Sequence, residues 1–321
     1  MDEQGRRAIL RRAQAAAIKG VGDAIKTAWF LVRIIVPISL GISILDWCGA
    51  LPVIARILAP LMRLLGLPGE AALVFLSAAL LNIYSAIAVA GSLSLDLREA
   101  TILAIMCLTA HNLIVETQVM RKSGSSGLKM AALRIVIALA AGWAYSRFLP
   151  DSLSALSFSA AEAGAHQPLG SMILAWSIST ARLTAKIAIL VVAIMVVQRF
   201  LEEFAIMDAL SRLFAPMMQV FGLPAKASFL WIVINVVGYA YGAGIVAEHI
   251  ASGRMKPQEG DLFNHHASVC HSLVEDTALF LAVGLPLFWL IVPRLALAAA
   301  VVWLEKARRH FVRRSFRVGI R

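Results

Sequence analysis

The sequence predicts an all-α, polytopic membrane protein, and three observations lead to this prediction. Hydrophobic residues make up 60% of the 321 residues and charged residues only 15%, whereas soluble domains are about 45–50% apolar and about 25% charged. Several apolar runs, including 29–44, 71–93 and 280–303, are long enough to cross a hydrocarbon core of about 30 Å as helices. The short alternating segments typical of a membrane β-barrel are not found in the sequence.

A repeat divides the sequence into two homologous halves. The segment LAPLM at 58–62 returns as FAPMM at 214–218, displaced by 156 residues, and each is followed by Gly-Leu-Pro after the same gap. Further along, HNLIVET at 111–117 returns as HSLVEDT at 271–277, displaced by 160 residues. Chance similarity between apolar helices does not produce an ordered series that includes Pro, Gly and His. The two halves are therefore predicted to share one fold.

Each half is predicted to contain a long helix, a short helix rich in Leu and Arg, an interrupted span, a His-bearing span and a closing span. The long helices are expected at 24–47 and 172–200, and the short helices at 50–65 and 203–221. The interrupted spans are expected at 69–93 and 225–248, and the His-bearing spans at 98–120 and 261–283. The closing spans are expected at 128–149 and 284–304. The chain then divides into an N-terminal amphipathic basic segment (1–26), a first repeat (27–149), an extracytoplasmic linker with the start of the next leading helix (150–179), a second repeat (180–307) and a basic tail (308–321).

The distribution of Lys and Arg predicts the orientation. The N-terminal segment, the loops at 121–129 and 254–256 and the C-terminal tail are basic, whereas 150–170 contains no Lys or Arg. Basic segments stay in the cytoplasm, so both termini are expected there and the linker outside. An odd number of crossings per half is then needed, which turns one repeat upside down. Either the short helix crosses, or the interrupted span is a re-entrant hairpin; four crossings per half would instead give parallel repeats.

Polar residues inside the predicted spans mark the candidate binding site. The interrupted spans contain Asn82, Ser85, Asn235, Gly238 and Tyr241. Clustered glycines permit a helix to unwind, and broken helices at matching positions of two repeats indicate a transport site. Close helix packing, for which small residues are also chosen, is the alternative explanation of the glycines.

The His-bearing spans contain the ionisable candidates. They are His111, Asn112 and Glu116 in the first half and His271, Ser272, Glu275 and Asp276 in the second. Ionisable groups within a membrane are costly and therefore candidates for function. A hydrogen-bonding solute site, a proton relay, a transition-metal site and a buried polar pair without any ligand all fit these residue types.

The sequence gives less indication of a role for the other charged or reactive residues. Arg33 and Lys186, or Arg134 and Arg294, are candidate counter-ions for the acids or contacts for an anionic substrate. His265 and His266 are interpreted as surface histidines. The cysteines Cys48, Cys107 and Cys270 are too scattered for a disulfide framework or a CxxC metal site. No phosphate loop, HExxH or GxSxG motif is found, so an enzyme, a catalytic residue, a metal and a cofactor are not expected.

The duplicated Gly-Leu-Pro turn, the interrupted span with its Asn and small residues and the polar span after it resemble the nucleoside-recognition, or Gate, membrane proteins. That group includes the spore maturation proteins A and B and is similar to the gate region of bacterial ferrous-iron transporters. The resemblance covers both repeats and implies inverted repeats with a site at their interface. It points to the matching residues Asn82, Ser85, Asn235 and Gly238 and to His111, Glu116, His271 and Asp276. No GTP-binding motif is found, so driven iron uptake is not expected.

The resulting hypothesis is an inner-membrane transporter or gate of a bacterium that binds a small solute or ion between inverted repeats. A non-transporting assembly or partner protein, with a homo-oligomer or a second membrane protein as partner, is the alternative. A membrane metal-dependent hydrolase that uses His271, Glu275 and Asp276 is a remote alternative. Despite the net charge of +11, the expected partner is anionic lipid at the basic cytoplasmic loops and not nucleic acid.

Overall fold

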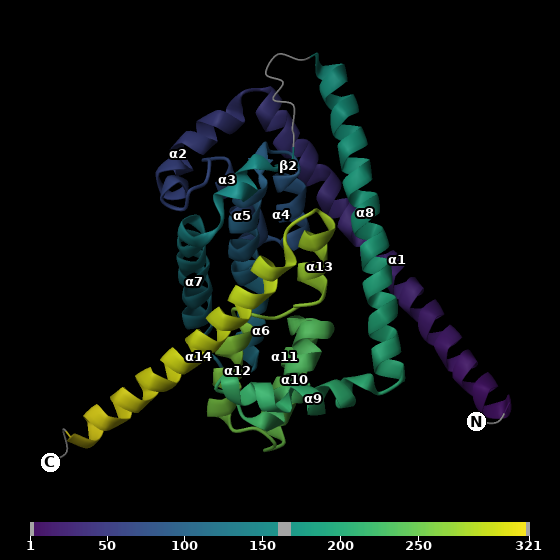
Figure 1. Ribbon diagram of the computed structural model, residues 1–321, viewed down its shortest axis with the longest axis vertical. Coiled ribbons are helices and arrows are strands. Elements are labelled where there is room, and N and C mark those ends of the chain that lie inside the picture. The colour runs from purple at the N-terminus through teal and green to yellow at the C-terminus, as the bar shows by residue number, and fades with distance from the viewer. Residues whose placement is uncertain (1–2, 160–167, 319–321) are drawn as a thin grey trace.

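The computed structural model describes residues 3–159 and 168–318 and shows a helical bundle with one small two-stranded sheet (Figure 1). The first half contains α1 (Glu3–Trp47), α2 (Ala50–Leu64), α3 (Ala71–Leu80), α4 (Ile83–Ala90), α5 (Leu97–Ala110), α6 (Leu113–Lys122) and α7 (Gly127–Phe148). The second contains α8 (Leu169–Glu203), α9 (Ile206–Val220), α10 (Ser228–Val236), α11 (Tyr239–Ala251), α12 (Pro257–Ala267), α13 (Glu275–Ala282) and α14 (Leu287–Val318). Strand β1 (Leu95–Asp96) pairs with β2 (Ser157–Ser159), and the short 3₁₀ helices are η1 (Asp151–Ala155) and η2 (Ala225–Ala227).

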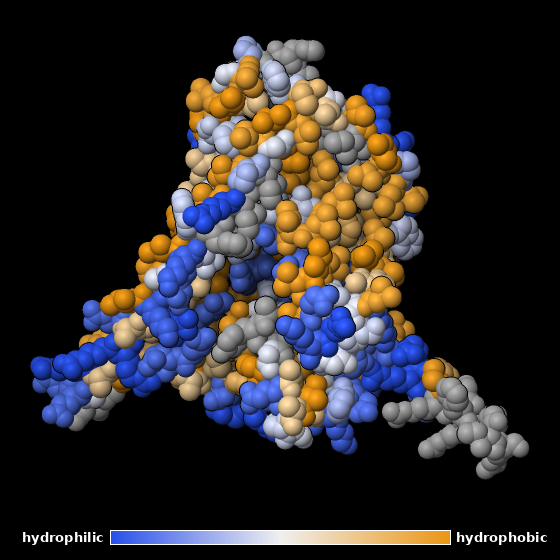
Figure 2. Space-filling view, turned by 180° about the vertical axis from the view of Figure 1, so that it is seen from behind, coloured by the Kyte–Doolittle hydropathy of each residue, from blue (hydrophilic) through white to orange (hydrophobic). Residues whose placement is uncertain are grey.

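Four helical segments of the described chain are long and apolar enough to cross a membrane. They are Leu97–Lys122, which combines α5 and α6, then Gly127–Phe148, Leu169–Glu203 and Leu287–Val312. The predicted class, an all-α polytopic membrane protein, is therefore confirmed. Figure 2 shows apolar residues over most of the upper part of one face and polar residues gathered at the lower end, near the two termini.

The Gly-Leu-Pro turns end α2 and α9 in the same way. Gly66 and Gly222 have φ angles of 68° and 72°, a left-handed conformation that glycine adopts without steric cost. The amides of the next residues, Leu67 and Leu223, donate to the carbonyls of Met62 and Met218 at 3.0 and 2.8 Å. This is the hydrogen-bond pattern of a Schellman helix end, so equivalent residues of the two halves stop equivalent helices.

Equivalent helices lie at opposite ends of the molecule. Helix α2 lies at the upper end in Figure 1 and α9 at the lower end, while α1 and α8 pack along one another between these ends. The two long helices approach closely at Gly20, where a Cβ atom would lie 2.9 Å from the Cα of Val196. The opposed positions of α2 and α9 favour the inverted arrangement over parallel repeats.

Each interrupted span is a hairpin whose two ends lie at the same end of the molecule. A helix of 10 residues such as α3 rises only about 15 Å, half of a hydrocarbon core. Helices α3 and α4 pack side by side, and the chain then returns to β1 at the upper end (Figure 1). At the lower end, Lys226, ahead of α10, donates to the carbonyl of Arg254, after α11, at 3.1 Å. This geometry favours the re-entrant option.

The N-terminal segment is part of a longer helix. Helix α1 runs without a break over 45 residues, so no helix boundary separates the predicted segment 1–26 from the first repeat. Arg12 forms a 2.7 Å ion pair with Glu203 at the end of α8. The other predicted segment boundaries stay predictions.

The linker and the α11–α12 loop are expected to label from opposite sides of the membrane. On a Cys48→Ser background, Ser154→Cys should react with an impermeant thiol reagent applied to intact cells, because η1 lies at the end opposite both termini (Figure 1). Ser252→Cys, which is equally exposed, should react only in inverted vesicles. Labelling of both cysteines from the same side would contradict the inverted orientation.

Candidate functional site

Both His-bearing spans break in the middle, and each histidine lies in the break. Helix α5 ends at Ala110 and α6 begins at Leu113, and between them Asn112 has a φ angle of 47°. The equivalent Ser272, between α12 and α13, has a φ angle of 48°. The amides of these two residues donate to carbonyls of the re-entrant hairpins, Asn112 to Ala78 at 2.8 Å and Ser272 to Ile234 at 2.9 Å. Each hairpin therefore supports the break in its own half.

A buried arginine bridges each break. Arg134 on α7 donates from Nε to the carbonyl of Thr109 at 2.9 Å and from Nη2 to the carbonyl of His111 at 2.7 Å. Arg294 on α14 donates to the carbonyls of Val269, at 3.2 Å, and His271. A helix end leaves its last carbonyls without intrahelical partners, and these guanidinium groups supply the missing donors. Both arginines are 0% exposed.

The same arginines face the acids of the following half-helices. Arg134 Nη1 lies 2.7 Å from Glu116 Oε2, and Arg294 Nη2 lies 3.9 Å from Asp276 Oδ2. Of the two pairs of candidate counter-ions, Arg134 and Arg294 are therefore the ones that face Glu116 and Asp276. Arg33 instead lies over the ring of Trp29, 5.0 Å from its centroid.

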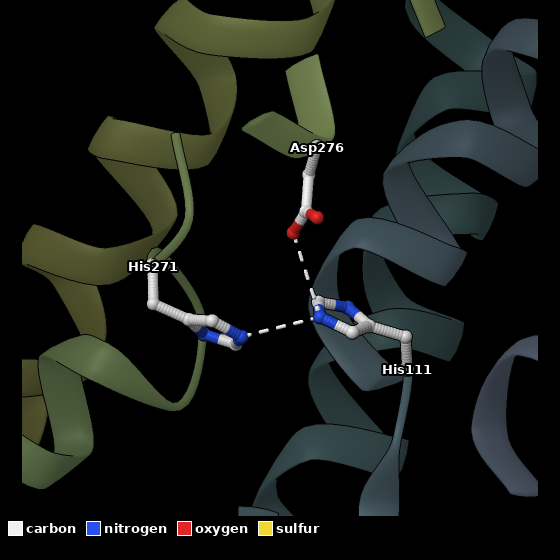
Figure 3. Close-up of side chains that lie close together, drawn as sticks. All are labelled: His111, His271 and Asp276. Carbon is white, nitrogen blue, oxygen red and sulfur yellow. Dashed lines mark hydrogen bonds and ion pairs between the residues drawn. The ribbon is translucent and has the colours of Figure 1, made fainter. Parts of the chain in front are cut away.

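The two histidines meet at the centre of the bundle. Nε2 of His271 lies 3.2 Å from Nε2 of His111 and 3.2 Å from Glu116 Oε1. Nε2 of His111 also lies 3.2 Å from Glu116 Oε1 and 3.4 Å from Asp276 Oδ2. The rings approach from opposite elements, with Asp276 directed at the ring of His111 (Figure 3). All four side chains are buried, so the two halves of the chain contact one another here through these four ionisable groups.

The tautomer of each histidine follows from its second ring nitrogen. Nδ1 of His111 lies 3.0 Å from the carbonyl oxygen of Cys107, and Nδ1 of His271 lies 2.6 Å from that of Ala267. A carbonyl oxygen only accepts hydrogen bonds, so both Nδ1 atoms donate. In the neutral imidazoles the two Nε2 atoms, which face each other, therefore carry lone pairs.

The second hairpin contacts this centre through its polar residues. The carbonyl of Asn235 accepts a hydrogen bond from the amide of Val274 at 3.1 Å, and a Cβ at Gly238 would lie 3.8 Å from Ser272 Oγ. Asn235 Nδ2 donates to the carbonyl of Trp231 at 2.8 Å. Its Oδ1 is buried without a hydrogen-bond partner within the described part of the chain, which leaves one acceptor for a ligand or water.

The first hairpin contributes differently. Asn82 caps α4, since its Oδ1 accepts from the amide and the hydroxyl of Ser85 at 2.9 and 3.0 Å. Within the described residues, these two side chains bond to each other and not to the histidines. Tyr84, which was not predicted as a site residue, donates to Glu275 and so joins the first hairpin to α13. The side chain of Tyr241 lies outside the described residues.

Two further residues near the site were not predicted. The ring of Tyr239 lies 5.5 Å from that of His271, centroid to centroid, and its hydroxyl donates to Asn264 Oδ1 at 2.8 Å. Asn264 Nδ2 lies 2.9 Å from the hydroxyls of both Ser123 and Ser125 in the loop after α6. Tyr239 lies in the glycine-rich stretch of the second interrupted span. That position in the sequence could have indicated Tyr239 as a site residue.

The interpretation of His265 and His266 as surface residues is wrong. They are 1% and 0% exposed, because α12 packs against α14 over its last turns. Nε2 of His266 accepts a hydrogen bond from Trp231 Nε1 at 2.9 Å. Neighbouring polar residues made this helix resemble an exposed one in the sequence.

These features define a polytopic α-helical membrane protein with a polar centre between two broken helices, and known proteins share this class. Residues 28–127 match the family model Gate, described as nucleoside recognition. The chain is 28% identical over 285 residues to the uncharacterized membrane protein YvoD of Bacillus subtilis (strain 168), an alignment that covers 88% of this chain and 91% of the relative. The predicted resemblance to the Gate proteins is thus confirmed. No solved structure matches the chain.

Replacing the bridging arginine should destabilise the protein strongly. Arg134→Met removes the donors of the Thr109 and His111 carbonyls and leaves Glu116 without its guanidinium partner. Breaking a buried ion pair costs about 3–5 kcal/mol, so we expect a markedly lower midpoint of thermal unfolding in detergent. The control, Arg33→Met, alters an exposed arginine and should change stability by less than about 0.5 kcal/mol. Equal midpoints for the two variants would contradict the bridging role.

Proposed function

We propose that this chain is a membrane transporter or gate for a small solute or ion that binds where the two broken helices meet. One observation carries the proposal: His111, Glu116, His271 and Asp276 converge at the point where both spans interrupt their hydrogen bonding. Non-helical backbone at membrane depth is tolerated where it is buried in protein or lines a cavity. Ionisable groups at such a place mark a substrate or ion pathway.

The arrangement of the helices supports an inverted-repeat transporter. In this proposal α1, α5–α6 and α7 cross the membrane in the first half, and α8, α12–α13 and α14 cross in the second. The hairpins α3–α4 and α10–α11 enter from opposite sides and return. Three crossings per half reverse the orientation of the second half. The hydrophilic lower end (Figure 2), where both termini lie (Figure 1), then faces the cytoplasm of a bacterium across its inner membrane.

A cavity lined by both polar and apolar side chains supports access to the interior. A space of about 250 Å³ lies between α1, α4 and α8. Its lining includes the hydroxyls of Ser39, Ser92 and Thr180 and the cationic residues Arg182 and Lys186. Val283, which directly follows α13, also lines it. Water and polar solutes are therefore able to approach the helix that carries Asp276.

Alternating access would come from movement of one repeat relative to the other. Side-chain contacts between the halves near the centre include those of the four ionisable side chains, the hydrogen bond from Tyr84 to Glu275 and the hydrogen bonds from Asn264 to Ser123 and Ser125. By contrast, the arginine bridges and the hairpin supports lie within one half each. Each half can therefore move as a unit while the contacts between the halves separate. Nucleosides belong among the solutes to be tested because the matching family model is described as nucleoside recognition.

A cysteine beside the central carboxylate should become reachable from water if the site opens. Thr277 is 3% exposed and its hydroxyl has no hydrogen-bond partner in the described chain, so Thr277→Cys should fold normally. On a background of Cys48→Ser, Cys107→Ala and Cys270→Ala, we expect a charged methanethiosulfonate to label it from at least one side of oriented vesicles. Ala138→Cys, on the fully buried face of α7, serves as the control that stays unlabelled.

The accessibility result decides between transport and the assembly alternative. Transport requires that Thr277→Cys reacts well above the rate of Ala138→Cys, because the central residues must meet water during each cycle. If Thr277→Cys is as unreactive as Ala138→Cys from both sides, the centre is a closed polar contact. The proposed transport function would then be wrong.

A further inference from the structure

Four hydrogen-bond acceptors point at one another in the buried centre. In the neutral imidazoles both Nε2 atoms carry lone pairs, because both Nδ1 atoms donate to backbone carbonyls. Glu116 Oε1 lies 3.2 Å from each of these nitrogens, and Asp276 Oδ2 lies 3.4 Å from that of His111. Lone pairs and carboxylate oxygens at these distances repel one another unless a positive charge lies among them. A single proton would satisfy only one of the pairs.

The spacing of these atoms fits the ligands of one metal ion. Zinc binds imidazole nitrogen and carboxylate oxygen at about 2.0–2.2 Å in tetrahedral geometry, which separates neighbouring ligand atoms by about 3.3 Å. The observed separations are 3.2 Å between the nitrogens, 3.2 Å from each nitrogen to Glu116 and 3.4 Å from His111 to Asp276. One ligand atom from each of His111, His271 and Asp276 lies within 4.8 Å of the others, and these three residues form the group that can surround one ion.

The surroundings also resemble those of a metal centre. Histidine ligands usually donate their second ring nitrogen to a carbonyl or carboxylate, which fixes the ring and the tautomer. His111 and His271 both do so. Arg134 and Arg294 offset the carboxylate charges, but they also bond to carbonyls at the C-terminal ends of α5 and α12. These helix ends carry partial negative charge, so the arginines do not cancel the carboxylates alone.

A second group of similar residues serves as a contrast. Asp261, His265 and Glu305 also gather ligand atoms within 4.8 Å of one another. Their carboxylates are already paired with cationic side chains, since Glu305 bonds to Arg308 and Lys129 at 2.8 and 3.0 Å and Asp261 pairs with Arg309. That cluster is a salt-bridge network at the basic end of the molecule, and its acceptors need no metal.

We propose that His111, His271 and Asp276 bind a divalent transition-metal cation, with Glu116 beside the two histidines. The identification of this cation as the cargo rests on the transport function proposed above, whereas the binding site itself does not. Imidazole and carboxylate ligands suit Zn²⁺, Fe²⁺ and Co²⁺ more than Mg²⁺ or Ca²⁺, which prefer oxygen alone.

Binding of Co²⁺ to the purified, chelator-treated protein in detergent tests this site without any transport assay. We expect one Co²⁺ per chain and the intense visible absorption of a four-coordinate Co²⁺ ion, with Zn²⁺ as a competitor and Mg²⁺ without effect. His271→Gln and Asp276→Asn should each weaken Co²⁺ binding by more than about 10-fold, because removal of even an outer-shell partner costs about 10–100-fold. His265→Gln, which changes another buried histidine, should bind as the wild type does.

Asp276→Asn keeps the experiment decisive if His271→Gln does not fold. Asp276 Oδ2 has no hydrogen-bond partner among the described residues and lies 3.9 Å from Arg294, so the amide should disturb the fold little. Absence of four-coordinate Co²⁺ absorption in the wild type, or its retention in Asp276→Asn, would overturn the metal site. Co²⁺ binding with an unreactive Thr277→Cys would instead retain the metal site and reject transport. A reactive Thr277→Cys without Co²⁺ binding would instead reject the metal site and retain the transport proposal.

Discussion

A helix that breaks halfway through a membrane leaves backbone groups without hydrogen-bond partners, and the structure depends on how these groups are satisfied. Arg134 and Arg294 each donate to two carbonyls at the end of one half-helix and face the acid that begins the next. An unsatisfied buried acceptor costs about 1–3 kcal/mol, so each arginine offsets several kcal/mol at one place. These hydrogen bonds stabilise the breaks at His111 and His271.

The amide side of each break depends on the re-entrant hairpins. Asn112 and Ser272 have left-handed backbone conformations, and their amides donate to the carbonyls of Ala78 and Ile234. Ala78 and Ile234 are 156 residues apart, the same displacement as between the Gly-Leu-Pro turns. A hairpin, a broken helix and an arginine thus form one interlocked unit in each half. The histidines project from these units toward each other, so the chemistry lies at the contact between two rigid bodies.

Much of the fold could be predicted from the sequence. Helix order, the turns after α2 and α9 and the burial of His111, Glu116, His271 and Asp276 follow from hydrophobic run length, Gly-Pro signals and the repeat. The depth of a helix does not follow from its periodicity, and for this reason the choice between a crossing and a hairpin stayed open. Charge alone also did not distinguish Arg134 from Arg33, since only tertiary packing buries one of them.

The hairpins show where pattern matching is limited. Asn82 and Asn235 appeared to have similar roles, but the 156-residue displacement pairs Asn82 with Gly238, and both of these residues precede a helix start. Asn82 caps its helix with a side chain, whereas Gly238 has a φ angle of 109° and brings the backbone close to Ser272. The side chains of Asn82 and Gly238 thus differ although their backbone positions correspond.

The central claim is that the paired broken helices form a transport site, and flux measures this most directly. Purified protein reconstituted into liposomes would be tested for uptake of nucleosides and of divalent metal ions, with His249→Gln, at a half-buried histidine position, as the matched control for His271→Gln. The account predicts uptake of at least one solute by the wild type and by His249→Gln, and its loss in His271→Gln. Uptake that is equal in His271→Gln and wild type would contradict it.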